Sequence, residues 1–246
     1  MQKGRELKRV VLARAVRWHL EHRILRYRRA VSRIGKPGLV RHSISPEARL
    51  SEHLMIYYWW GQLDFGGDEL LESFYALAPS DLRAHAMWSV RQFLAQADAP
   101  PAAFERLRKL IERRLAAAIQ SRSADEFLPE LEMFGYWFVE GHFEEQWALT
   151  TLLSTLRLTK KTHDESNVVK RLAELCPRYP TECVECLRLM IEGDRERWVV
   201  VSVEANARDV LRLALESNVL QAALAARRLV QDLIMLGYYE FRTLLH

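Results

Sequence analysis

The stretch from residue 166 to residue 193, SNVVKRLAELCPRYPTECVECLRLMIEG, decides the fold because its apolar residues indicate two short helices separated by prolines. The first half carries apolar residues at helical spacing, namely Val168, Val169, Leu172 and Leu175. Beyond the prolines, the same pattern returns at Val184, Leu187 and Ile191. Steps of three and four residues place such side chains on one helix face. The stretch therefore predicts a helix pair.

Helix pairs of this kind recur along the chain and predict a repeat architecture. They begin near residues 46, 81, 124, 166 and 203. The intervals of roughly 35–43 residues fall within the ~33–47 residues of two-helix repeats, which bury their apolar faces by stacking. Only 10 glycines and 8 prolines occur in 246 residues, which disfavours a β-sandwich or barrel. We therefore expect an all-α fold, an α-solenoid of about five HEAT-like helix pairs, in preference to a compact bundle with the same stripes.

Local signals mark several expected helix ends. Ser80 follows a proline and is a candidate N-cap, and Pro101 suits the first turn of a helix. Residues 123–126, Ser-Ala-Asp-Glu, match a capping box, in which the serine and the glutamate side chains satisfy backbone amides. Gly237 is a candidate for the residue that follows a helix C-terminus.

Charge divides the chain into a basic arm, residues 1–42, and a helical-repeat domain, residues 43–246. The arm contains thirteen Lys and Arg residues against two acids, so it carries a charge of +11. Since the whole chain carries +4, the repeat domain must carry −7. The mean charge therefore conceals a strongly basic segment on an acidic body.

The arm predicts a long basic helix over residues 5–34, which ends at the Gly-Lys-Pro-Gly sequence of residues 35–38. Arginine binds phosphate bidentately, so a helix of this charge density suits nucleic acid or anionic lipid. The candidate contact residues are Arg14, Arg17, Arg23, Arg26, Arg28 and Arg29. Three other roles remain open for the arm, which are contact with the acidic body, docking to an acidic partner domain, and a solvated linker.

No known catalytic motif appears in the sequence. A P-loop needs a glycine-rich turn that ends in Gly-Lys-Ser/Thr, and the Gly35-Lys36-Pro37 sequence lacks both the earlier glycine and the hydroxyl. The chain has no Gly-x-Ser-x-Gly elbow, and the Asp-Phe-Gly tripeptide at residues 64–66 lacks the other kinase motifs. We therefore expect no enzymatic activity and no cofactor.

Residue types that often carry chemistry have structural interpretations in this sequence. Cys176, Cys183 and Cys186 lack a recognisable fourth zinc ligand, so we interpret them as buried thiols and expect no metal. The carboxylates at 144–145 and at 64, 68 and 69 have no nucleophile beside them, which favours helix-start or loop acids over acid–base catalysts. Core packing is expected for Trp59, Trp60, Trp88, Trp137, Trp147 and Trp198.

Composition also indicates a compartment. An odd, clustered set of three cysteines suits a reducing environment. No apolar run approaches the ~18–20 residues of a membrane span, and the N-terminus has no secretory signal. A transit peptide is a weaker alternative, because the Arg-rich arm has a single serine. We expect a cytoplasmic protein without a transmembrane segment, and the sequence leaves its oligomeric state open.

Clusters of aromatic and charged residues follow one another in a characteristic order over residues 50–246. They are 57–61 (YYWWG), 134–138 (FGYWF), 147–149 (WAL), 171–174 (RLAE), 185–188 (ECLR) and 236–245 (LGYYEFRTLL). This region resembles the C-terminal helical repeats of large bacterial STAND-type NTPases, several of which act in antiphage defence. The resemblance implies repeats that sense a ligand or partner, while separate NTPase and effector domains perform the chemistry. This chain departs from the full pattern because it contains no NTPase motif, and the arm is not part of the resemblance.

Two main functional hypotheses follow from the sequence, and an enzyme with an unfamiliar site is a third. The first is a non-catalytic scaffold that recognises a protein, peptide or other ligand on its concave face, as the sensor region of a defence protein would. The alternative is a nucleic-acid-binding protein that uses the arginine-rich helix of residues 5–34.

The alternative hypothesis predicts nucleic-acid affinity that falls steeply with salt, because each arginine–phosphate contact releases counterions. Replacing Arg14, Arg17, Arg23, Arg26, Arg28 and Arg29 by Ala should abolish binding, as measured by fluorescence anisotropy at several salt concentrations. Undetectable or salt-insensitive binding by the wild-type chain would remove the hypothesis.

Overall fold

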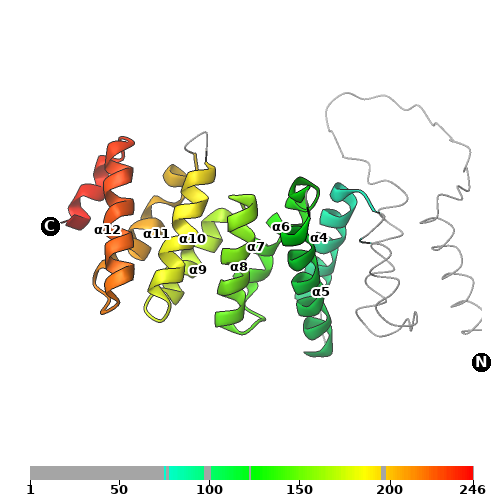
Figure 1. Ribbon diagram of the computed structural model, residues 1–246. Helices are drawn as coiled ribbons and strands as arrows, with labels where there is room; N and C mark the ends of the chain where they lie inside the picture. The colour runs from blue at the N-terminus through cyan, green and yellow to red at the C-terminus, as the bar shows by residue number, and fades with distance from the viewer. Residues whose placement is uncertain (1–74, 76–77, 97–100, 122, 195–197, 246) are drawn as a thin grey trace, which may run out of the picture. The chain divides into compact units, whose positions relative to one another are not determined.

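The computed structural model describes residues 75, 78–96, 101–121, 123–194 and 198–245, and the arm lies outside these ranges. The described residues form helices and connections without a strand, which confirms the expected all-α class (Figure 1). They fall into two units that divide between Ala99 and Pro100. The first contains α4 (Ser80–Gln96). The second contains α5 (Pro101–Gln120), η1 (Ala124–Glu126), α6 (Leu128–Glu132), α7 (Phe134–Glu140), α8 (Glu145–Thr159), α9 (Glu165–Leu175), α10 (Pro180–Gly193), α11 (Trp198–Leu215), α12 (Leu220–Met235) and η2 (Tyr239–Leu245).

Helices of the second unit pack in two series, which Figure 1 shows along the ribbon from α5 to η2. In one series α7 contacts α9, and α9 contacts α11. In the other, α6 contacts α8, α8 contacts α10, and α10 contacts α12. Contacts between consecutive helices, such as α9 with α10 and α11 with α12, join the two series. Each helix therefore packs mainly against elements that are near it in the sequence.

The core of this unit is formed by the apolar stripes that the sequence predicts. In α9 the predicted residues Val168, Val169, Leu172 and Leu175 are all buried. In α11 a stripe with the same helical spacing is also buried completely, and it consists of Val203, Ala207, Val210, Leu211 and Ala214. Alternation of large and small side chains lets helices approach closely while little space stays empty. The helical spacing of the apolar residues therefore determines which face of each helix is buried.

The segment from residue 123 to residue 140 differs from the single capped helix that the sequence predicts. The Ser123 side chain makes no capping hydrogen bond, and a 3₁₀ turn, α6 and α7 follow one another. The helix is interrupted after Glu132, because its carbonyl oxygen accepts hydrogen bonds from the His163 backbone N–H (2.9 Å) and the Thr162 hydroxyl (3.3 Å). The capping-box prediction was wrong because the Glu126 N–H donates to the backbone carbonyl oxygen of Ser123 (3.4 Å) and not to its hydroxyl.

Other helix ends agree more closely with the expected positions. Pro101 is the first residue of α5, as predicted. Gly237 follows the end of α12 with φ +101°, a left-handed conformation in which glycine avoids a Cβ clash. Ser80 is the first residue of α4 rather than its N-cap, since the Arg83 N–H already bonds to the carbonyl oxygen of Pro79 at 3.0 Å.

A buried ion pair joins α5 to α6. Arg114 donates from Nε (3.0 Å) and Nη2 (2.6 Å) to the same carboxylate oxygen of Glu130. The two side chains are only 14% and 2% exposed. The Arg114 guanidinium also lies over the Phe127 ring, with 4.6 Å between Cζ and the ring centroid. Since an unpaired buried charge is costly, the pair fixes how these two helices meet.

Two glycines allow the closest backbone contacts between successive helix pairs. A Cβ atom on Gly135 would lie 2.1 Å from the carbonyl oxygen of His163. A Cβ atom on Gly193 would lie 2.0 Å from the carbonyl oxygen of Lys160. Both obstacles are backbone atoms, so no side-chain rotation can relieve them. The α8–α9 connection therefore packs directly onto α7 and onto the end of α10.

Gly135→Ala and Gly193→Ala should each lower the free energy of unfolding by about 3 kcal/mol, near the upper limit for overpacking. Gly237→Ala is the control, because nothing lies within 4 Å of its added Cβ and only its positive φ opposes alanine. Its cost should be smaller, about 1–2 kcal/mol. Urea unfolding followed by circular dichroism measures all three, and equal losses would contradict the close approach.

Candidate binding surface

The arginines proposed to contact nucleic acid lie outside the described residues. These are Arg14, Arg17, Arg23, Arg26, Arg28 and Arg29, and the acids at 64, 68 and 69 lie outside as well. The binding role of the arm therefore stays a prediction. A candidate surface can be built only from the second unit.

The three cysteines are buried thiols, as interpreted from the sequence. The thiol of Cys176 donates to the carbonyl oxygen of Val210 at 3.4 Å. A hydrogen bond with Cys176, together with burial, raises the pKa of Cys183. Burial also raises the pKa of Cys186, so both groups hold their protons and are poor nucleophiles. Among the described residues, no group of three or more His, Cys, Asp or Glu side chains could hold a metal ion.

The acidic pair at 144–145 begins a helix, which confirms the helix-start interpretation. Glu144 is the N-cap of α8, and its carboxylate accepts hydrogen bonds from the backbone N–H groups of Trp147 (2.7 Å) and Gln146 (2.9 Å). These bonds lower the pKa of Glu144. Glu145 forms a salt bridge with Arg178. Both carboxylates therefore have structural partners.

Two of the tryptophans pack within an aromatic cluster between α5, α7 and α8. Trp137 is only 1% exposed, and Trp147 is half-buried against Phe143, with ring centroids 4.8 Å apart. The indole N–H of Trp147 donates to Glu112 of α5 at 2.7 Å. These contacts favour packing over base stacking for both residues. Trp88 of α4 is 37% exposed, so it is only partly covered.

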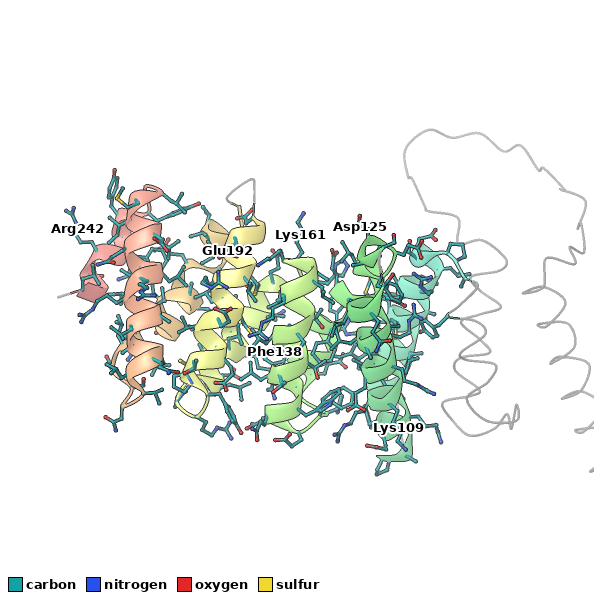
Figure 2. The ribbon with its side chains drawn as sticks, in the orientation of Figure 1. Lys109, Asp125, Phe138, Lys161, Glu192 and Arg242 are labelled. Atoms are coloured by element: carbon teal, nitrogen blue, oxygen red, sulfur yellow. The ribbon has the colours of Figure 1, made fainter. Side chains whose placement is uncertain are left out.

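A cluster of ionisable residues forms where three connections meet, and we name it the loop-edge cluster. It consists of Glu132, Lys161, His163, Glu165 and Asp194. Its members come from the end of α6, the α8–α9 connection, the start of α9 and the residue after α10. Figure 2 shows Lys161 projecting from the same edge of the unit as Glu192. The glycine contacts described above hold these connections together.

Aromatic stacking fixes the histidine of this cluster. The rings of His163 and Tyr136 lie parallel within 6°, with their centroids 5.5 Å apart. The His163 backbone is held by its hydrogen bond to Glu132. The cluster therefore rests on a rigid support and is not carried by a free loop.

The carboxyl groups of the loop-edge cluster are poorly solvated. Burial raises the pKa of Glu132, and the nearby His163 and Lys161 oppose this shift. Burial also raises the pKa of Glu165, and the negative charges of Asp194 and Glu132 add to the shift while Lys161 opposes it. Among the described residues the cluster holds three acids, one lysine and one histidine, and Asp194 has a further interaction. The carboxylates of such a surface can accept hydrogen bonds from a ligand and can attract a positively charged group.

Sequence reasoning missed the loop-edge cluster, because its members are dispersed over residues 132–194 and lie at helix ends. One signal was present, since Glu132 and Glu165 are 33 residues apart and so are Lys161 and Asp194. That interval is within the range of a two-helix repeat. Equivalent positions in stacked repeats lie side by side, so a search for ionisable residues at the repeat interval could have found the cluster.

No family model, curated protein or solved structure matches this chain. In the described ranges, none of the helices is long and apolar enough to cross a membrane. The candidate surface is therefore argued from the geometry of this chain alone.

The raised pKa of Glu165 predicts that Glu165→Gln stabilises the fold at neutral pH. The pKa of Glu165 in the folded state lies above its ordinary value of 4.5, so folding favours the protonated carboxyl. The stability that this gives is fully present below pH 4.5 and is lost as the pH rises through the raised pKa. Glutamine resembles the protonated form, so the variant should gain stability above pH 4.5. Since the side chain is half-exposed, the gain should stay below about 1 kcal/mol. Denaturant unfolding between acidic and neutral pH measures it.

Glu144→Gln is the control, because it should change the stability of the fold in the opposite direction. Its lowered pKa predicts that the substitution destabilises the fold at neutral pH and that the difference disappears below pH 4.5. Identical pH profiles for the two variants would contradict the assignment of the loop-edge cluster.

Proposed function

We propose that this chain is a non-catalytic helical-repeat scaffold that binds a protein partner. The observation that supports this most strongly is the alternation of contacts in two series, α7–α9–α11 and α8–α10–α12. Helix pairs that stack in chain order are the arrangement of an α-solenoid, so we infer HEAT-like repeats for this unit. Proteins of that architecture present extended surfaces, and most recognise partners with them rather than with an enclosed pocket.

The loop-edge cluster is the proposed contact surface. Elsewhere on the unit several charged groups are paired with each other, as Arg188 is with Glu185 (2.7 Å) and Lys160 is with Glu192 (3.0 Å). The carboxyls of Glu132 and Glu165 have raised pKa values, so their ionised forms lack full solvation. A lysine or arginine from a partner would supply the missing positive charge. We infer a partner with a basic segment.

The resemblance to the repeats of STAND-type NTPases supplies a biological setting for this proposal. We propose that the chain is the sensor region of a bacterial defence NTPase, which acts in the cytoplasm. The NTPase chemistry would then belong to another domain or chain. Nucleic-acid binding through the arm stays the alternative, and the described residues do not test it.

Affinity capture with the full chain as bait tests the proposed contact surface. The wild-type chain should capture a reproducible protein from a bacterial lysate, with or without phage infection. The double substitution Glu165→Lys and Asp194→Lys should reduce this capture at least about tenfold, because a basic segment would meet repulsion instead of attraction. Mass spectrometry with labelled reference peptides measures the captured amount.

A matched variant distinguishes the effect of the loop-edge cluster from the effect of the net charge of the chain. Glu105→Lys with Asp209→Lys makes the same change in net charge at two exposed acids on α5 and α11, and it should capture the partner as the wild-type chain does. Equal loss in both variants, or no captured protein at all, would contradict the proposal. Circular dichroism confirms that each variant is folded.

A further inference from the structure

The outward side of α12 and the adjoining η2 collect most of the exposed large apolar residues. Ten such residues are exposed among those the structure describes, and seven of them lie between residues 219 and 245. We name the central ones the α12 face. They are Leu220 (72% exposed), Leu224 (47%), Met235 (86%), Leu236 (42%) and Tyr239 (66%).

Helical geometry places the main residues of this face on one side of α12. Leu220, Leu224 and Met235 are four and eleven residues apart, and both steps return to nearly the same direction at 3.6 residues per turn. The opposite side of α12 is buried against the unit through Ala222, Ala226, Leu229, Val230 and Leu233. Figure 1 places α12 and η2 at one end of the helices of this unit. The other elements of the second unit therefore leave the α12 face uncovered.

Charged residues on the same side also lack partners within the described ranges. Arg227, Arg228 and Asp232 are exposed and form no salt bridge there. On the neighbouring helices the pattern is different, since Arg188 of α10 pairs with Glu185, and Arg212 of α11 pairs with Asp209 and Glu216. The α12 face thus combines uncovered apolar residues with two unpaired cations and one unpaired anion.

The charges and apolar groups are arranged so that the face complements itself. Let two copies of α12 run antiparallel, related by a two-fold axis level with Val230. Arg228 of each copy then lies opposite Asp232 of the other, and Leu224 lies opposite Leu236, one residue from Met235. At the ends of the contact, Leu220 lies opposite Glu240, next to Tyr239. No arginine is opposed to an arginine in this register.

We propose that the α12 face is the interface for a second copy of this chain, in an antiparallel two-fold dimer. The exposed fractions of the five residues of the face correspond to about three whole large apolar residues, on the order of 550 Å². That area is near the upper end of the range for the largest apolar patch on a typical monomer, ~300–600 Å². It is about two thirds of the ~800 Å² that each partner contributes to a standard interface. Two reciprocal Arg228–Asp232 pairs set the register.

Sedimentation equilibrium of the full chain tests this dimer. The wild-type chain should dimerise reversibly, and Leu224→Lys with Met235→Lys should raise the dimer Kd at least about 30-fold. Val201→Lys is the matched control, because Val201 of α11 is 61% exposed and lies outside the face. It should leave the Kd unchanged. Thermal unfolding shows that all variants fold.

Two further variants test the register itself. Arg228→Asp alone and Asp232→Arg alone should each weaken the dimer about tenfold, because like charges would then face each other. The double swap should recover the wild-type Kd within about threefold, since opposite charges are restored. Oxidised Leu224→Cys/Met235→Cys should form a covalent dimer, and the buried native thiols will not interfere.

Several outcomes would overturn the proposal. The wild-type chain could stay monomeric at every concentration, or form a dimer that is insensitive to the α12 substitutions. A dimer that Val201→Lys disrupts would place the interface elsewhere. Failure of the charge swap to rescue association would refute the antiparallel register. None of these results bears on capture of a basic partner at the loop-edge cluster.

Discussion

The structure depends on the fact that no helix pair in the second unit, as far as it is described, can cover its own apolar residues. The helix α9 shows the constraint most clearly, because its four buried aliphatic residues are shared among contacts with α7, α10 and α11. Burial of a large aliphatic side chain contributes about 1.5–3 kcal/mol, which greatly exceeds what an exposed salt bridge supplies. Stacking is therefore driven by apolar burial, and the ion pairs on the outer surface of α10 and α11 make only small additions.

The polar surface follows from the same stacking. For the connection between α8 and α9 to lie on α7, the backbone must approach Gly135 closely, and the carbonyl of Glu132 must find its hydrogen bonds in residues 162–163. That approach brings acidic residues from the ends of α6, α9 and α10 to one edge. The loop-edge cluster is thus a product of the packing. The pKa values of Glu132 and Glu165 are raised because the connections meet closely enough to bury these carboxyl groups.

Much of the helical organisation could be predicted from sequence, because helical pitch leaves a local signal. The stripe of α9 was identified residue by residue, and so was the glycine that follows α12. The interruption after Glu132 could not be predicted, since it depends on hydrogen bonds from residues about thirty positions away. The loop-edge cluster and the α12 face are also non-local properties. Local sequence shows which residues are apolar, but it does not show which apolar residues lack a neighbour.

Contacts between elements close in sequence also shape how the chain reaches its fold. Since α9 meets α7 and α11, and α10 meets α8 and α12, little of the second unit requires distant segments to find each other. Closing short loops costs little entropy, so folding of such a unit is rapid and can nucleate at any well-packed pair. The most extensively packed helices, α9 and α11, would then act as the seed from which order spreads outward in both directions.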